Sequence, residues 1–207
     1  MNYFGRYEMK TYVINRKPQV LDWNAIPALA MDTALWVGPA PVEPQAQLCY
    51  DEEALYVRLS TKEANIRAEE TGKYGMPCLD SCLEFFFCPM ENSNTYFNIE
   101  FNPNGCLYLG IGNDRYDLIR LIPEEDNPLQ AQPKRTEDGW EITYRITAAF
   151  IRRFFPGFEL ASGGMLRGNF YKCGDETVQP HYYCWNPITQ EQPDYHLSQF
   201  FGKLYLE

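Results

Sequence analysis

Two runs of aromatic and β-branched residues, at positions 80–89 and 95–102, flank a polar segment, and this pattern constrains the chain more than any other. It predicts an antiparallel β-hairpin. Successive side chains on a strand point to opposite faces, so alternate residues should form a buried row on each strand. The predicted core row consists of Leu83, Phe85 and Phe87 on the first strand and Phe97, Ile99 and Phe101 on the second.

The opposite face of the hairpin mixes carboxyl, amide and aromatic side chains. It carries Asp80, Cys82, Glu84 and Phe86 on the first strand and Tyr96, Asn98 and Glu100 on the second. Polar groups between aromatic rings suit a sugar, which needs hydrogen bonds at its rim and flat apolar contact on its face. The same pattern is typical of a partly solvated outer face of an antiparallel sheet, so the hairpin by itself leaves both interpretations open.

The rest of the chain consists of short predicted strands separated by turn signals, such as Asn102-Pro103-Asn104-Gly105 and Asp138-Gly139. Thr147 is predicted to cap the one short helix, from Ala148 to Phe155. About a dozen strands at this spacing predict an all-β fold, namely a two-sheet antiparallel β-sandwich of the jelly-roll kind with one short helix. The 207 residues fit one domain, 1–207.

The charge balance narrows the class of ligand. The formal net charge is −10, from 18 basic and 28 acidic residues. An acidic chain repels phosphate backbones and anionic lipid surfaces, which argues against nucleic acid and membrane partners. Neutral ligands and cations remain compatible. The oligomeric state is left open by the sequence.

The cysteines and the N-terminus predict a cellular compartment. The seven Cys residues are odd in number, and Cys49, Cys82, Cys88 and Cys106 lie within or beside apolar runs. Both features argue against a disulfide framework and favour a reducing environment. Residues 1–10 lack the apolar run of a signal peptide. The chain is therefore predicted to be cytoplasmic, or secreted if a signal has been removed from it.

Five stretches with recognisable motifs lie in order along the chain. They are Leu21-Asp22-Trp23, Ala54-Leu55-Tyr56-Val57, Asp80-Ser81-Cys82-Leu83-Glu84-Phe85-Phe86, Arg167-Gly168-Asn169-Phe170-Tyr171, and Tyr183-Cys184-Trp185-Asn186-Pro187 with the following residues 193–196 and 200–204. Together these stretches resemble carbohydrate-binding module family 9. Each stretch alone is a weak signal, whereas the ordered set is specific for a fold. The resemblance implies a two-sheet antiparallel sandwich that binds a saccharide without catalysis.

In sugar-binding members of this family, a saccharide end lies between two Trp rings, and a Glu and an Arg bond its hydroxyls. The resemblance therefore implies that Trp185 stacks on the sugar and that Glu84 and Arg167 bond it. Asn98, Asn169 and Tyr74 are further candidates for ligand contact. This chain has Cys78 where the first Trp of the clamp is expected. Trp23, Trp36 and Trp140 are predicted to be core or structural residues.

No cofactor is predicted. Family members often hold structural calcium, yet the sequence offers no Asp-rich loop for it. His181, Cys173 and Cys184 match no standard zinc spacing. Two alternatives to sugar binding stay open: a structural or protein-interaction module that has lost its ligand, and a glycoside-processing enzyme with Glu84 and Glu100 as its acid pair.

Overall fold

The computed structural model describes residues 8–207. The N-terminal stretch predicted to lack a signal peptide lies largely in residues 1–7, outside the described residues. No helix in the described part of the chain is long and apolar enough to span a membrane.

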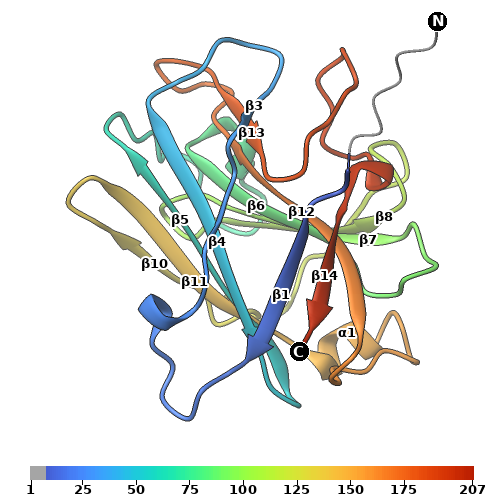
Figure 1. The fold of residues 1–207 in the computed structure, drawn as a ribbon. Coiled ribbons are helices and arrows are strands. Elements are labelled where there is room, and N and C mark those ends of the chain that lie inside the picture. Colours follow the sequence, from blue (N-terminus) through green and yellow to red (C-terminus); the bar gives the residue numbers. More distant parts are fainter. Residues whose placement is uncertain (1–7) are drawn as a thin grey trace, which may run out of the picture.

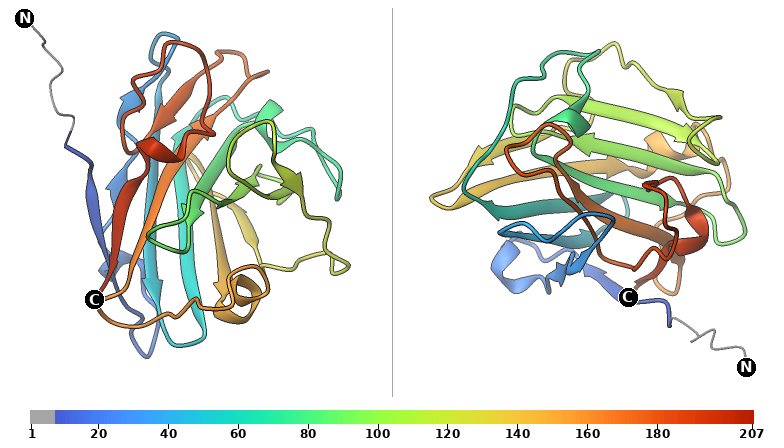
Figure 2. Two further views of the ribbon diagram at one scale, coloured as in Figure 1. Left: turned by 90° about the vertical axis from the view of Figure 1, so that its right-hand side faces the viewer. Right: turned by 90° about the horizontal axis from the view of Figure 1, so that it is seen from above.

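Eleven of the fourteen strands among residues 8–207 form one hydrogen-bonded path that curls into two layers (Figures 1 and 2). The first layer contains β10 (Gln132–Arg135), β11 (Gly139–Thr147), β5 (Ala54–Glu63) and β4 (Val42–Tyr50). The second contains β14 (Gly202–Leu206), β12 (Met165–Cys173), β6 (Cys82–Cys88), β7 (Tyr96–Phe101), β8 (Leu107–Gly112) and β9 (Ile119–Arg120). The predicted all-β sandwich is confirmed.

Strand β1 (Thr11–Arg16) joins the two layers. Its first four residues pair in parallel with β14, and its last two, Asn15 and Arg16, pair in parallel with β4. Every other strand pair in the described chain is antiparallel, as predicted. The sandwich therefore departs from a purely antiparallel arrangement only at this strand.

Three short strands lie off this path. They are β2 (Leu29–Ala30), β3 (Thr33–Ala34) and β13 (Tyr182–Cys184). β2 pairs with β4, while β13 pairs with both β12 and β3. The 3₁₀ helices η1 (Trp23–Ala25), η2 (Pro77–Leu79) and η3 (Ser198–Phe200) lie in connecting segments.

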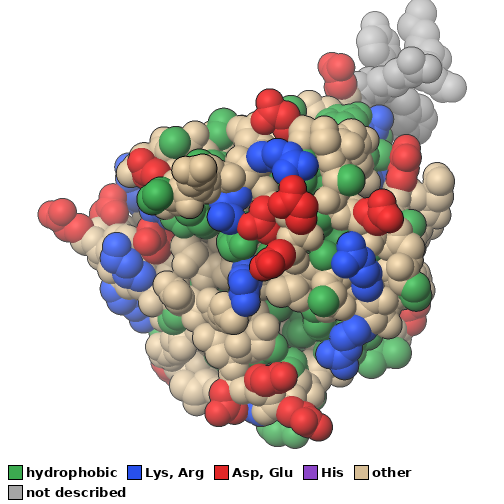
Figure 3. Space-filling view, turned by 90° about the horizontal axis from the view of Figure 1, so that it is seen from below, with side chains coloured by type: hydrophobic (Ala, Val, Ile, Leu, Met, Phe, Trp, Pro, Cys, Tyr) green, Lys and Arg blue, Asp and Glu red, His purple; other side chains and the backbone are tan. Residues whose placement is uncertain are grey.

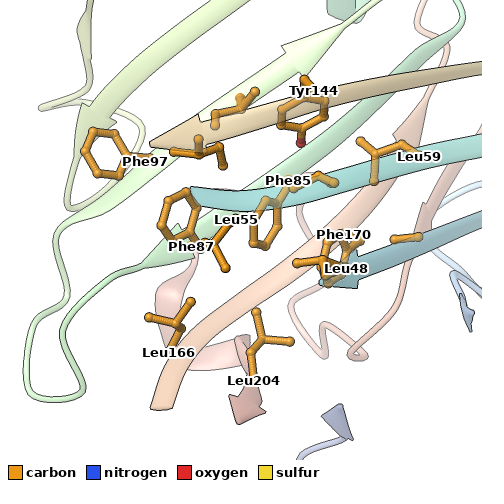
Figure 4. Close-up of a cluster of buried hydrophobic side chains, with 14 of the residues drawn as sticks. Leu48, Leu55, Leu59, Phe85, Phe87, Phe97, Tyr144, Leu166, Phe170 and Leu204 are labelled. Atoms are coloured by element: carbon orange, nitrogen blue, oxygen red, sulfur yellow. The ribbon is translucent and has the colours of Figure 1, made fainter. Parts of the chain in front are cut away.

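The hydrophobic core lies between the two layers (Figure 4). It contains the complete row predicted from the hairpin, whose six members are each at most 1% exposed. The Phe85 and Phe170 rings stack at 4.5 Å between centroids, and Phe87 packs on Phe97 at 5.4 Å. Phe101 meets Tyr144 of the facing layer at 5.1 Å. Alternation along the strands thus explains the interior directly.

Helix α1 (Ala148–Arg152) closes one end of the sandwich, because Phe150 within it and Phe154 after it pack on Phe97. The predicted cap is confirmed, since the Thr147 hydroxyl oxygen accepts a hydrogen bond from the backbone N–H of Phe150 at 3.1 Å. The helix ends before the predicted Phe155.

Three polar side chains, Glu63, Lys172 and His181, are buried together. The Lys172 ammonium lies 3.2 Å from the Glu63 carboxylate and donates to the Cys173 carbonyl at 2.9 Å. His181 Nε2 lies 2.8 Å from the same ammonium. Lys172 and Glu63 are almost completely buried, so each charge depends on the other for compensation.

The outer surface mixes charged and hydrophobic side chains (Figure 3), and the cysteines are unpaired. In the view from below, acidic and basic side chains are interspersed, with hydrophobic side chains scattered among them (Figure 3). All seven Cys side chains are free thiols. Trp140 is buried as predicted, and Trp23 is half-buried in η1.

Candidate functional site

A cavity of about 460 Å³ lies on the outer face of the second layer. Strands β6, β7, β8 and β12 form its floor, because Glu84, Asn98, Tyr108 and Cys173 line it. The walls come from loop residues, including Arg115 and the segment 193–196. A volume of this size is within the range of small-molecule binding sites.

Two carboxyl groups lie side by side on this floor. Glu84 and Glu100 are directly paired across β6 and β7, so their side chains project to the same face. Glu84 is 2% exposed and Glu100 6% exposed. Glu84 accepts a hydrogen bond from the Cys173 thiol at 2.9 Å, and Glu100 accepts one from the Asn98 amide at 3.0 Å.

Burial and nearby negative charges raise the pKa of these carboxyls. Loss of hydration is the largest cause for both groups. The charge of Glu100 further raises the pKa of Glu84, and the nearby Asp175 raises the pKa of both. The cavity therefore holds carboxyl groups that lose their protons less readily than a solvated glutamate does.

Two buried oxygens in this group have no hydrogen-bond partner among residues 8–207. They are Asn98 Oδ1 and Glu100 Oε2. Both belong to residues that line the cavity. An unpaired buried polar atom costs about 1–3 kcal/mol, so a ligand that donates hydrogen bonds here would remove this cost.

Aromatic rings form one side of the cavity. Trp36 is half-buried, and its ring lies 5.6 Å from that of Tyr182 and 5.3 Å from that of Tyr195, centroid to centroid. The indole N–H donates to the carbonyl of Gln190 at 2.9 Å. Trp36 has a backbone φ of 57°, which bulky residues seldom adopt. The contacts of the ring and the unusual backbone angle both fix the position of Trp36 at the cavity.

The pairing of β3 with β13 explains how Trp36 reaches this place. Ala34 pairs with Tyr183, and Trp36 follows two residues later. Trp36 was predicted to be a core or structural residue, and this interpretation needs correction because its ring lines the cavity. Sequence periodicity gave no sign of the long-range pairing that carries it there.

Two of the predicted ligand residues, Glu84 and Asn98, are brought together at the cavity. Cys78, which replaces the expected Trp, also lines it, so the departure from the family pattern falls within this site. Asn98 was predicted only as a secondary candidate, yet its orphaned oxygen makes it prominent here.

The structure does not bring Trp185 to the cavity. Its side chain is 4% exposed and packs against Phe170 in the core, at 5.8 Å between ring centroids. Alternation accounts for this orientation: Tyr182 lines the cavity, whereas Tyr183 and Trp185, at odd offsets from it, belong to the interior cluster. Trp185 thus offers almost no surface to a ligand, and the predicted stacking role has no support from its position.

Arg167, Asn169 and Tyr74 also lie away from the cavity lining. The Arg167 guanidinium donates to the carbonyls of Ser93 at 2.6 Å and Ser198 at 3.1 Å, and it forms no ion pair with Glu84. Asn169 is fully buried and bonds the backbone of Asn186 through both ends of its amide. The Tyr74 side chain is 77% exposed.

The cluster of candidate metal-binding side chains found in the described residues is not of the kind that binds calcium. Within residues 8–207, one group of three side chains brings candidate metal-binding atoms within 4.8 Å of one another: Cys82, Glu84 and Cys173. Calcium prefers oxygen ligands, and two thiols are soft ligands unsuited to it. These residues therefore do not fit the calcium ion that the family resemblance implies.

Comparison with known proteins agrees with the architecture described above. The sequence profile of carbohydrate-binding family 9 matches residues 15–206. No curated protein matches the chain. A solved structure from Bacteroides uniformis, provisionally described as a carbohydrate-binding protein, superposes with a TM-score of 0.83 at 26% identity, over 97% of this chain and 100% of that chain.

Two further solved structures are of a family 9 module from Caldicellulosiruptor kristjanssonii. One contains cellotriose and one contains glucose. Both superpose with a TM-score of 0.70 at 12% identity and cover 96% of this chain, and 94% and 96% of their own chains respectively. At this identity the likeness concerns the fold.

Proposed function

The chain belongs to carbohydrate-binding family 9, and from this premise we propose that its cavity binds one end of a saccharide without chemical change. The observation that carries the proposal is the combination of aromatic walls with unpaired hydrogen-bond acceptors on the cavity floor. Pyranose rings present apolar faces and hydroxyl rims, and such a cavity complements both.

Each part of the cavity has a defined role in this proposal. Trp36 provides the stacking surface, with Tyr182 and Tyr195 holding its ring in place. Asn98 and Glu100 accept hydrogen bonds from sugar hydroxyls through the oxygens that lack a partner. Glu84 completes the polar floor beside them. The solved family 9 module that contains glucose and cellotriose supports a glucose-type ligand.

The experiment is a titration of intrinsic Trp fluorescence with monosaccharides and disaccharides, glucose and cellobiose among them. We expect a saturable change in the unmodified protein and a greatly weakened one in Trp36→Phe and Asn98→Ala. Trp23→Phe is a matched control, since Trp23 lies in η1 and does not line the cavity. Lack of response to every saccharide in a folded protein would contradict the proposal.

One observation favours a second candidate function. Glu84 and Glu100 are paired on neighbouring strands at the cavity floor, and a glycosidase needs two nearby carboxyl groups of unequal acidity. Hydrolysis of chromogenic glycosides, abolished in both Glu84→Gln and Glu100→Gln, would establish this function. Binding with no turnover would leave recognition as the function of the cavity.

A further inference from the structure

The cavity contains more acidic than basic groups. Glu84, Glu100, Asp175 and Asp194 line it, and Arg115 is the one Lys or Arg among the described residues that does so. Arg115 is paired with Asp194 at 3.4 Å. Glu84, Glu100 and Asp175 form no ion pair with any Lys or Arg of residues 8–207.

The nearest further cation is already committed to other groups. The Arg120 guanidinium lies 4.5 Å from the centre of the Tyr108 ring. It also donates hydrogen bonds to the carbonyls of Lys73 at 2.9 Å and Gly75 at 2.8 Å. Arg120 therefore weakens the negative potential near Glu100 without forming an ion pair with it.

The unsatisfied hydrogen-bonding capacity of the floor is acceptor capacity. The Asn98 amide directs its N–H group to Glu100 and leaves its oxygen unpaired. Glu100 Oε2 is unpaired as well, and Glu100 is only 6% exposed. A hydroxyl supplies one donor together with acceptor lone pairs, whereas an ammonium group supplies three donors and no acceptor.

From this geometry we propose that the saccharide recognised by the cavity is an amino sugar with a free amine, whose ammonium group binds between Glu84 and Glu100. The inference rests on the function proposed above and adds the class of sugar. A positive charge at this place offsets the repulsion between the two carboxylates and satisfies the orphaned oxygens. Trp36, which lines the same cavity, would contact the ring of the sugar.

N-acetylation should abolish the preference. An acetamide has no charge and presents one N–H donor and one carbonyl acceptor, so it places an additional acceptor beside an acceptor-rich floor. The three sugars glucosamine, glucose and N-acetylglucosamine differ only in one substituent, which is an ammonium, a hydroxyl or an acetamide group. They therefore separate recognition of the ammonium group from recognition of the ring.

The experiment is isothermal titration calorimetry near neutral pH. The probes are three matched pairs, glucosamine with glucose, galactosamine with galactose and mannosamine with mannose, together with the N-acetylated forms. We expect the amino sugar of at least one pair to bind about tenfold tighter or more than its neutral partner, and the N-acetylated form to have no such advantage. High salt should reduce the advantage, because part of it is electrostatic.

Variants test the assignment to these residues. Glu100→Gln is nearly isosteric and should reduce the amino-sugar preference to within about twofold while the neutral sugar still binds. Glu43→Gln removes an exposed carboxylate of β4 that pairs with Lys62 and should leave the preference unchanged. Thermal unfolding of each variant confirms that it is folded.

The outcomes separate the two proposals. Neutral sugars that bind as tightly as their amino counterparts, with binding lost in Trp36→Phe, would overturn the amino-sugar inference and leave the proposed function intact. A preference that persists in Glu100→Gln would overturn the assigned position of the ammonium group. No binding by any sugar to the folded protein would overturn the proposed function, and the inference with it.

Discussion

Glu84 and Glu100 face each other as direct partners across β6 and β7, on a sheet face that is almost completely removed from water. Ordinary strand alternation places them there, yet two neighbouring carboxylates are among the least favourable pairs that a sheet can bury. The protein tolerates them by keeping their protons more firmly than a solvated carboxyl does. This arrangement has measurable consequences for stability.

Stability should fall as pH rises across the range in which Glu100 ionises. Burial raises the pKa of Glu100 to about 7, from an unfolded value of about 4.3. The folded state thus binds more protons than the unfolded state between these values, and its free energy of unfolding decreases with increasing pH there. Glu100→Gln removes this loss and also relieves Glu84 of its charged neighbour. We expect the variant to gain about 1–3 kcal/mol relative to the unmodified protein between pH 5 and pH 8.

Urea unfolding at several pH values measures this difference. Glu43→Gln, at an exposed position, serves as the control for loss of one negative charge. Parallel stability profiles for the unmodified protein and Glu100→Gln would show that Glu100 has an ordinary acidity in the folded state.

Truncation of Trp36 should affect binding far more than folding. The side chain is half-buried at the cavity, and the stacking role proposed for it is worth about 1–3 kcal/mol for rings on rings. Trp36→Ala is therefore expected to raise the dissociation constant for a saccharide about 5–150-fold. Calorimetric titration measures the affinity, and an unchanged affinity would exclude Trp36 from the binding surface.

Trp185→Ala should show the opposite behaviour. Because Trp185 is buried against Phe170, its removal leaves a core cavity and should lower the free energy of unfolding by about 3–5 kcal/mol. The fraction that remains folded should still bind saccharide. Chemical denaturation and titration on the same preparation separate the two effects, and loss of binding at full stability would place Trp185 at the ligand.

The buried pair Lys172 and Glu63 predicts a strongly non-additive response. Glu63→Gln leaves the Lys172 ammonium without a compensating charge and should cost about 3–5 kcal/mol of stability. Replacing both residues together, as Glu63→Gln with Lys172→Met, should cost less than Glu63→Gln alone, since neither charge of this pair then remains buried. Urea unfolding of the two single variants and the double variant tests this, and additive losses would argue against a charged pair.

The interior of this fold could be predicted from the sequence because it depends on alternation over short distances. The row Leu83, Phe85 and Phe87 needs only the period of a strand to be assigned to the core. The same argument places Glu84 and Glu100 together on the opposite face. Whether that face is solvated or forms a cavity depends on the loops that cover it, and their positions are not contained in any periodic pattern.

The aromatic residue at the site shows where sequence reasoning stops. Trp36 reaches the cavity through a two-residue strand, β3, and an unusual backbone angle. Trp185 lies at the end of β13, where one position along the strand decides between the cavity and the interior. Family resemblance predicted Glu84 and Asn98, which line the cavity, together with Trp185, which does not, and so it could not determine this one-residue choice.

The position of β1 has a consequence for how the protein is made. Its parallel partner β14 lies at the other end of the described chain, with Thr11 beside Lys203. The strand that connects the two layers therefore cannot complete its pairing until β14 has also left the ribosome. Such distant contacts close slowly, so the newly made sheets pass through a period with an open seam between β1 and the second layer.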